Sequence, residues 1–430
     1  MLYDCLIIGG GMAGLTCGIR CASEGLKTAI ISGGMNSLHF SSGSIDLAGY
    51  DNKGKIIKKP FDQISGIIAK QKNHPYSKVG IKTIKKSIAF FKDEMSRESL
   101  SLNSNGELNH FHISAIGTLK PSYLSQDSIF NESAIKVLHN KSKIAILNFS
   151  GFRDYYPAQT IDALKKNILF KNIEIISGEI SLPYYMNTEK NLHEFRSIDL
   201  ARIFETEKYL PRIADEITKA SGDAEAVSLP AFLGIKNYTA IRRRLEELTG
   251  KYIYEIPTLP PSILGLRLDN ALKNRFVNAG GDYISGDRAV SAEYSGGVLS
   301  RIITQNSGSS GITAEAYVLT TGSFFSGGIA SEYKRIFEPI LELQVNSGAA
   351  GSNWYSDSFF DKKSHPFLSY GVETDRNLNP KSKEGKTIKN LFCAGSVLSG
   401  YDPVKEGNGG GVAISTGFCC AERIIKGKKK

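Results

Sequence analysis

The chain has 430 residues, of which 41% are hydrophobic and 22% are charged. This composition is that of a folded globular protein and excludes a largely disordered one. No stretch approaches the roughly 18 consecutive apolar residues of a membrane-spanning helix, so we expect no direct membrane span. The formal net charge is +10, but the basic residues are scattered and are not interleaved with aromatic residues, so we expect no nucleic acid partner.

The cysteines and the start of the chain bear on cellular location. The 6 cysteines form no C-x-x-C pair, so we expect buried free thiols, with neither a metal site nor an iron–sulfur cluster. The first apolar strand is expected at residues 3–8, which leaves no room before it for a signal peptide. We therefore expect a cytoplasmic protein.

The N-terminal segment carries the clearest motif. Residues 3–8 are apolar and run into G-x-G-x-x-G, whose glycines are Gly9, Gly11 and Gly14. These glycines permit, in turn, a tight turn, a close approach of a phosphate to the backbone, and packing of the next helix on the strand. A helix is predicted over 15–24 and a second apolar strand over 27–32. This order predicts a nucleotide-binding βαβ unit whose helix N-terminus faces the phosphates.

The end of the second predicted strand lacks one expected residue. Dinucleotide-binding folds place Asp or Glu there, about 20 residues after the glycines, to accept hydrogen bonds from the adenosine ribose. This chain has Ser32, followed by two glycines. A serine still bonds a hydroxyl and does not repel phosphate as a carboxylate would, so the motif alone leaves the cofactor open.

Further segments of the same type lie far along the chain. A helix is predicted over 272–281, with strands over 282–284, 298–304 and 314–319. A strand and turn over 390–396 and a glycine run at 407–411 precede a last helix over 412–425. Between them, 50–260 is a mixture of helices and strands, and shorter strands are predicted at 340–345 and 368–374. The sequence predicts an α/β fold: a discontinuous Rossmann-like domain of residues 1–50, 262–330 and 386–430, with an inserted α+β substrate or cap domain of residues 51–261 and 331–385.

The pattern at the two ends of the chain resembles the glutathione-reductase-like flavoproteins. The shared segments are L-T-T-G at 319–322, N-L-F-C-A-G-S at 390–396 and G-N-G-G-G at 407–411. Within that superfamily, 39–47, 260–268 and 400–403 resemble the family of the B subunit of anaerobic glycerol-3-phosphate dehydrogenase, and the resemblance spans the whole chain.

This resemblance implies a flavoprotein that pairs with a catalytic A subunit and a membrane-bound iron–sulfur C subunit. The complex would oxidise sn-glycerol 3-phosphate to dihydroxyacetone phosphate and pass electrons to quinone, then to fumarate or nitrate. The chain would lie at the inner face of the cell membrane through its partner. The family implies FMN, with FAD as the alternative, and Ser32 agrees with FMN because FMN has no adenosine to hold. A free-standing flavin oxidoreductase and a non-catalytic assembly protein are the competing interpretations.

The resemblance also suggests which residues form the site. His39 is a candidate to act as a base for a substrate hydroxyl or to hold the flavin, against the alternative that it only bonds backbone. Arg267 and Lys405 are candidates to bind the substrate phosphate, against ordinary salt bridging. We expect the flavin to contact fifteen positions: Gly9, Gly11, Met12, Ala13, Gly14, Ser32, Ser41, Ser42, Gly43, Gly322, Gly395, Ser396, Asn408, Gly409 and Gly410.

Overall fold

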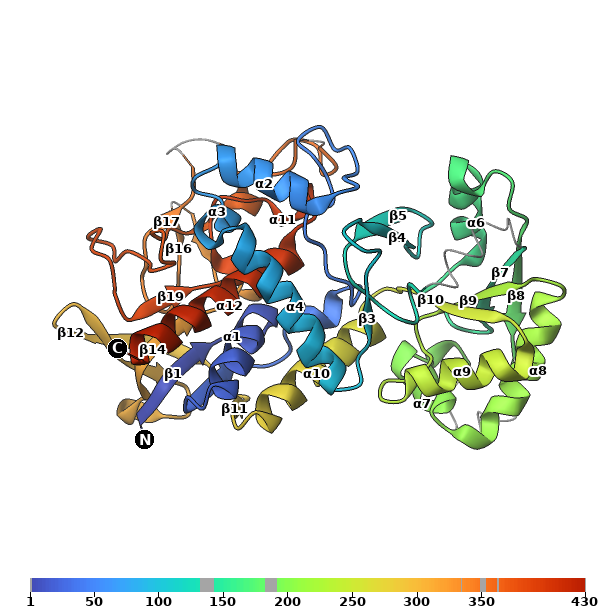
Figure 1. The fold of residues 1–430 in the computed structure, drawn as a ribbon, viewed down its shortest axis with the longest axis horizontal. Helices are drawn as coiled ribbons and strands as arrows, with labels where there is room; N and C mark the ends of the chain where they lie inside the picture. The colour runs from blue at the N-terminus through green and yellow to red at the C-terminus, as the bar shows by residue number, and fades with distance from the viewer. Residues whose placement is uncertain are drawn as a thin grey trace.

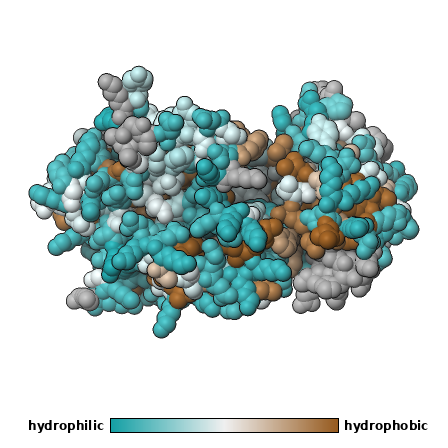
Figure 2. Space-filling view, turned by 90° about the horizontal axis from the view of Figure 1, so that it is seen from above, coloured by the Kyte–Doolittle hydropathy of each residue, from teal (hydrophilic) through white to brown (hydrophobic). Residues whose placement is uncertain are grey.

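The computed structural model describes residues 2–131, 143–181, 192–333, 335–348, 353–361 and 363–429. The chain forms two lobes, with the two labelled termini close together on the larger one (Figure 1). An ion pair between Lys428 Nζ and Asp4 Oδ1 joins the two ends of the chain. Figure 2 shows that the larger lobe presents a mainly hydrophilic surface in that view, while apolar side chains gather towards the smaller lobe.

A five-stranded parallel sheet forms the centre of the larger lobe. Its order is β11–β2–β1–β14–β19, with β1 (Leu2–Ile8) in the middle. The neighbours of β1 are β2 (Thr28–Ser32) and β14 (Thr313–Leu319). The outer strands are β11 (Asp282–Ser285) and β19 (Leu391–Cys393). Segments from both ends of the chain therefore share one sheet, as the sequence predicts, and buried apolar runs of this kind are typical of parallel strands.

Three helices pack together beside this sheet. Helix α1 (Met12–Ser23) contacts both α10 (Ile263–Asn278) and α12 (Gly409–Lys428). Glycines allow the closest approach, since a Cβ on Gly417 would lie 2.3 Å from the carbonyl oxygen of Ala13. Helix α10 begins nine residues before the helix predicted at 272, because the Ser262 hydroxyl caps it by accepting a hydrogen bond from the Gly265 N–H at 3.1 Å. An antiparallel hairpin, β12 (Ala289–Ser295) and β13 (Val298–Thr304), precedes β14.

The smaller lobe contains a second parallel sheet. Its order is β10–β9–β7–β8, built from β7 (Ile144–Phe149), β8 (Ile175–Ile180), β9 (Ala226–Pro230) and β10 (Tyr252–Ile256). Helices connect or flank these strands: α6 (Pro157–Lys165), α7 (Ser197–Phe204), α8 (Leu210–Ser221) and α9 (Tyr238–Thr249). The pattern predicts an α+β insert, but parallel strands joined through helices make an α/β unit, because a parallel connection needs a crossover.

The segment between the two sheets packs partly on the larger lobe and partly at the junction of the lobes. Helices α2 (Pro60–Lys70), α3 (Pro75–Val79) and α4 (Ile81–Arg97) belong with the larger lobe, where α4 contacts α10 and α12 (Figure 1). The boundary predicted at residue 51 assigned them to the insert. Short strands follow at the junction of the lobes: β3 (Leu102–Asn103), β4 (His110–Ile113), β5 (Leu119–Ser122) and β6 (Ser125–Gln126).

The strands predicted at 340–345 and 368–374 are much shorter in the structure. They are reduced to β17 (Val345–Asn346) and β18 (Gly371–Val372), which pair with each other. The nearby β15 (Ala330–Glu332) and β16 (Arg335–Phe337) form another small hairpin. All six cysteines are buried free thiols, as predicted. In the described ranges, no helix is long and apolar enough to cross a membrane, and no cluster of three or more His, Cys, Asp or Glu side chains is arranged to hold a metal ion.

Candidate flavin site

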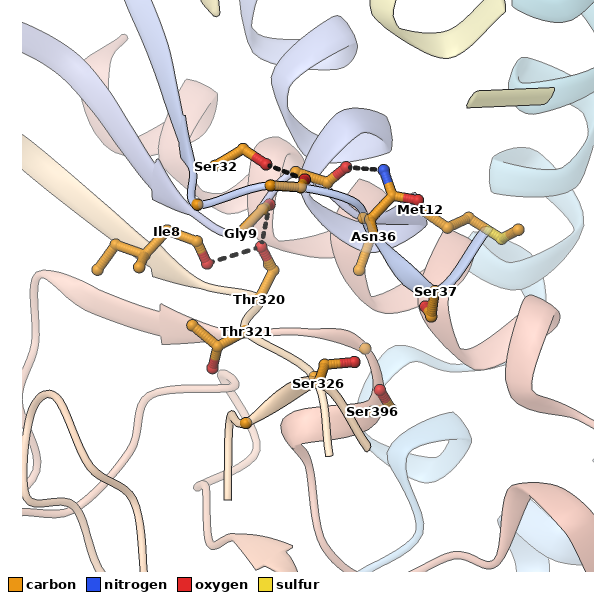
Figure 3. A pocket seen from close by; sticks show the side chains of 18 of the residues that line it. Ile8, Gly9, Met12, Ser32, Asn36, Ser37, Thr320, Thr321, Ser326 and Ser396 are labelled. Carbon is orange, nitrogen blue, oxygen red and sulfur yellow. Dashed lines mark hydrogen bonds between the residues drawn. The ribbon is translucent and has the colours of Figure 1, made fainter. Parts of the chain in front are cut away.

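A cavity of about 900 Å³ lies at the carboxyl ends of β1, β2, β14 and β19, where the first turns of α1 and α12 also begin. In an open parallel sheet this is the place where ligands bind. The volume is that of a site for a drug-sized or larger ligand. Figure 3 shows residues from these separate segments facing one another around it.

The glycine loop forms the middle of the cavity wall. Gly9 has a φ of +115°, and a Cβ there would lie 2.4 Å from the Thr320 carbonyl oxygen. The Thr320 hydroxyl contacts the carbonyl oxygens of Ile8 at 3.0 Å and Gly9 at 2.8 Å (Figure 3). A Cβ on Gly14 would lie 2.1 Å from the Gly9 carbonyl oxygen, whereas one on Gly11 would meet nothing within 4 Å. Gly9 and Gly14 thus serve close packing, and Gly11 leaves open space.

The first turn of α1 faces this open space without a side-chain cap. Gly11 is the N-cap residue, it makes no side-chain cap hydrogen bond, and the first turn of α1 holds no acidic residue. The N–H groups at a helix start need acceptors, and they carry the positive end of the helix dipole. A phosphate group fits this arrangement.

The far end of the cavity lies between the end of β2 and the start of β12. Ser32 donates a hydrogen bond to the Gly34 carbonyl oxygen at 3.3 Å, and Arg288, which lies against Gly33, also lines the cavity. The carboxylate of Asp287 is already engaged, because it accepts hydrogen bonds from the Thr304 hydroxyl at 2.6 Å and from the N–H of Asn306 at 3.1 Å. Among the described lining residues, no carboxylate is left free for an adenosine ribose.

The opposite end is formed by β19 and α12. Gly395, with a φ of +78°, and Ser396 follow β19, and the N–H of Gly395 donates to the Thr416 hydroxyl of α12 at 2.9 Å. Gly409 and Gly410 form the first turn of α12 and line the cavity. This second helix start also has no side-chain cap hydrogen bond. Two helix N-termini therefore point positive dipole ends at one cavity.

Most of the predicted flavin contacts line this cavity, and four do not. Gly14, Ser42, Gly43 and Asn408 lie behind the wall, since Gly14 packs on the loop and Asn408 is buried. The cavity wall also includes residues that the motif did not indicate, such as Asn36 and Arg288. The lining residues among the predicted contacts are Gly9, Gly11, Met12, Ala13, Ser32, Ser41, Gly322, Gly395, Ser396, Gly409 and Gly410.

Comparisons with known proteins agree with this geometry. The FAD binding domain family matches residues 4–412. The B subunit of anaerobic glycerol-3-phosphate dehydrogenase from Aliivibrio fischeri is 37% identical over 438 residues, which cover 99% of this chain and 96% of that protein. The chain belongs to this B-subunit family. The Vibrio cholerae protein of the same name is also 37% identical and covers 99% of this chain and 97% of its own length.

The resemblance predicted from the sequence is thus confirmed, and the family match indicates a flavin cofactor. Among solved structures, 3-ketosteroid delta1-dehydrogenase from Sterolibacterium denitrificans has 10% sequence identity and a TM-score of 0.43, with 99% of this chain and 100% of that chain covered.

In this member of the B-subunit family, His39 is held in a polar network outside the cavity wall. Its Nε2 lies 2.8 Å from Asp269 Oδ2, which also contacts Lys273 Nζ at 2.7 Å. Asn36 links the network to the glycine loop, donating hydrogen bonds to Asp269 Oδ1 at 2.7 Å and to the Gly10 carbonyl oxygen at 2.8 Å. These contacts favour the interpretation of His39 as a structural residue that fixes the segment after β2 against α10.

Arg267 is buried outside the cavity, and its guanidinium is bound by other groups of the protein. Its guanidinium forms a two-point ion pair with Glu255, at 2.6 and 2.9 Å, and both side chains are at most 1% exposed. Its Nε donates to the Gly234 carbonyl oxygen at 2.7 Å, and the group stacks over Tyr238. Arg267 does not line the cavity, so its anion-binding role is not carried forward. Lys405 lies on the short α11 (Pro403–Glu406), half-buried and also outside the cavity lining.

Proposed function

We propose that this chain is the flavin-bearing subunit of a quinone-linked anaerobic sn-glycerol-3-phosphate dehydrogenase. The complex oxidises glycerol 3-phosphate to dihydroxyacetone phosphate, and electrons reach quinone through a membrane-bound iron–sulfur subunit, with fumarate or nitrate as terminal acceptor. The observation that carries the proposal is one cavity faced by two uncapped helix starts, in a chain that matches the B-subunit family over 99% of its length. A bound flavin supplies a two-electron acceptor for oxidation of an alcohol.

The residues of the cavity suit a flavin phosphate at one place and a flavin ring at another. The open space beside Gly11 and the start of α1 suits the phosphate. The start of α12, with Gly409 and Gly410 at the wall, suits the ring, because backbone N–H groups and the helix dipole stabilise negative charge. No part of this arrangement needs His39 or Arg267.

We propose FMN as the flavin, with FAD as the competing assignment. The absence of a free carboxylate at the β2 end, among the lining residues that the structure describes, supports FMN, because nothing there matches the usual partner of an adenosine ribose. The cavity volume of about 900 Å³ favours FAD, because an adenosine needs additional space. Mass spectrometry of the flavin released by denaturing the protein decides between them. FMN as the released species supports the assignment, and FAD alone overturns it.

The name of the family points to a multi-subunit complex. We propose a catalytic A subunit and an iron–sulfur C subunit as partners, with this chain at the inner face of the membrane through the iron–sulfur partner. In this arrangement the smaller lobe is the substrate or cap domain.

The test is reduction of the bound flavin by glycerol 3-phosphate under anaerobic conditions. Loss of the visible flavin absorbance would be followed with this chain alone and with the catalytic partner added. Bleaching that requires the catalytic partner supports the proposed complex. Bleaching by the isolated chain supports a free-standing oxidoreductase, and no flavin or no bleaching in either sample supports an assembly protein.

A further inference from the structure

A polar cluster outside the cavity lining adjoins the first turn of α12. It consists of Ser42, Asp46, His112, Lys120 and Ser122, contributed by the segment after β2 and by the β4–β5 hairpin. The hairpin lies at the junction of the two lobes (Figure 1). None of these residues belongs to the glycine motifs.

Asp46 and Lys120 are the centre of this cluster. Lys120 Nζ lies 2.7 Å from Asp46 Oδ2 and donates to the Ser42 hydroxyl at 3.3 Å. Ser122 donates a 2.7 Å hydrogen bond to the other carboxylate oxygen of Asp46. His112 Nδ1 lies 3.4 Å from the same Ser122 hydroxyl, and burial holds the pKa of His112 well below its ordinary value, so the ring is neutral.

The position of the cluster is fixed by contacts with the cavity wall. Asp46 accepts a hydrogen bond from the Gly411 N–H at 2.8 Å through its carbonyl oxygen, and a Cβ on Gly410 would lie 3.3 Å from the Asp46 nitrogen. Gly410 lines the cavity, as does Ser41, the neighbour of Ser42. The cluster therefore adjoins the cavity wall through Asp46, next to Gly410, and through Ser42, next to Ser41, at the end that we assign to the ring.

Two members of the cluster are buried, and the two charged members are partly exposed to solvent. Ser122 and His112 are buried, at 1% and 4% exposed. The side chain of Lys120 is 37% exposed and that of Asp46 is 14% exposed. Ser122 and His112 thus form a buried support for Asp46 and Lys120, whose side chains are partly exposed, and the Asp46 carboxylate keeps lone pairs for further donors besides Lys120 and Ser122.

We propose that Asp46 and Lys120 bind the hydroxyl-bearing part of the substrate, a polyol phosphate, and so determine its selection. A carboxylate that accepts and an ammonium that donates match a pair of neighbouring hydroxyls, each of which both donates and accepts. The carboxylate next to Lys120 disfavours a phosphate at the same place, because like charges repel. The inference rests on the proposed function and adds to it the residues that recognise the substrate hydroxyls.

The test compares two ligands on the full chain purified with its flavin. Glycerol 3-phosphate has both hydroxyls, and n-propyl phosphate has the same phosphate and carbon chain without them. Binding is measured by isothermal titration calorimetry, so the readout does not depend on turnover. In the unmodified protein, glycerol 3-phosphate binds more tightly. Asp46→Asn and Lys120→Met each reduce its affinity by about tenfold or more, which is the effect of losing a hydrogen bond to a charged group, while binding of n-propyl phosphate changes little.

Lys85→Met is the matched control, since Lys85 is an exposed lysine on α4 that pairs with Glu107, and this variant keeps the preference. Circular dichroism and the retained flavin spectrum report whether each variant is folded. If Asp46→Asn and Lys120→Met are folded and keep the full preference for glycerol 3-phosphate, the inference is wrong and the pair only fixes the hairpin to the wall. If the unmodified chain, tested alone, shows no preference for glycerol 3-phosphate over n-propyl phosphate, the inference is wrong, whereas bleaching of the flavin with the catalytic partner added decides the proposed function separately.

Discussion

The buried ion pair between Arg267 and Glu255 gives the sharpest test of how the two lobes are joined. Arg267 lies on α10 of the larger lobe, and Glu255 lies on β10 of the smaller one. Replacing Arg267 with Met leaves the Glu255 carboxylate in a site that is 0% exposed, with the Leu233 N–H at 2.8 Å as a remaining donor. Breaking a buried pair in this way costs about 3–5 kcal/mol.

The expected result is a large shift in the urea midpoint, followed by far-UV circular dichroism. The double variant Arg267→Met with Glu255→Gln is expected to lose less than the sum of the two single variants, because it removes both charges. Arg244→Met is the control, since Arg244 pairs with Glu247 on the surface of α9 and its loss should cost at most about 0.5 kcal/mol. A midpoint for Arg267→Met equal to that of Arg244→Met would refute the reasoning.

Three further outcomes follow from the described contacts. Gly14→Ala should lower the free energy of unfolding by about 1–3 kcal/mol, because its Cβ would clash with the Gly9 carbonyl oxygen. Gly11→Ala should keep the urea midpoint and lose flavin affinity in a fluorescence titration, because its Cβ would enter the open space of the cavity. Equal behaviour of the two variants would contradict the separate roles that we assign to these glycines. Burial lowers the pKa of His110 to about 4. Only the unfolded chain therefore takes up a proton at this histidine as pH falls from about 6.5 to 4, and the free energy of unfolding should fall by about 3 kcal/mol across that window. The urea midpoint of His110→Gln should depend less on pH, and an unchanged dependence would contradict the lowered pKa of His110. A thiol reagent should modify none of the six buried cysteines in the native protein and all six in urea; rapid labelling of the native chain would contradict their burial.

The sequence was informative where one local motif determines the structure. The glycine loop and β2 are each specified by adjacent residues and lie where the motifs place them, whereas α12 begins at Gly409, three residues before the predicted start at 412. The strands at 313–319, which pair with β1, and at 391–393, which pair with β14, were also predicted, because apolar strands ending in glycine turns are distinctive. Eleven of the fifteen predicted flavin contacts line the cavity.

The predictions that the structure did not support depend on tertiary packing. Arg267 lies in the part of α10 that precedes the predicted helix start at 272, because Ser262 caps the helix earlier, and its side chain pairs with Glu255. No local signal pairs residues of α10 with β10. The cluster around Lys120 was missed for the same reason, because its members come from positions 42–46 and 112–122 and meet only when the hairpin folds back.

The position of β1 explains why both ends of the chain are needed for the site. One edge of β1 pairs with β2, which follows it immediately, and the other pairs with β14, about 300 residues later in the sequence. The glycine loop lies in the local βαβ unit but packs on Thr320 after β14, and the other end of the cavity is built from β19 and α12. Helix α12 packs along α1 and supplies both the second helix start and the Gly411 N–H that bonds the Asp46 carbonyl oxygen, so the C-terminal segment is needed for the fold as well as for the cavity wall. The two helix starts act on the ligand together, which is why the opening motif alone indicates a nucleotide and the pair of ends indicates a flavin.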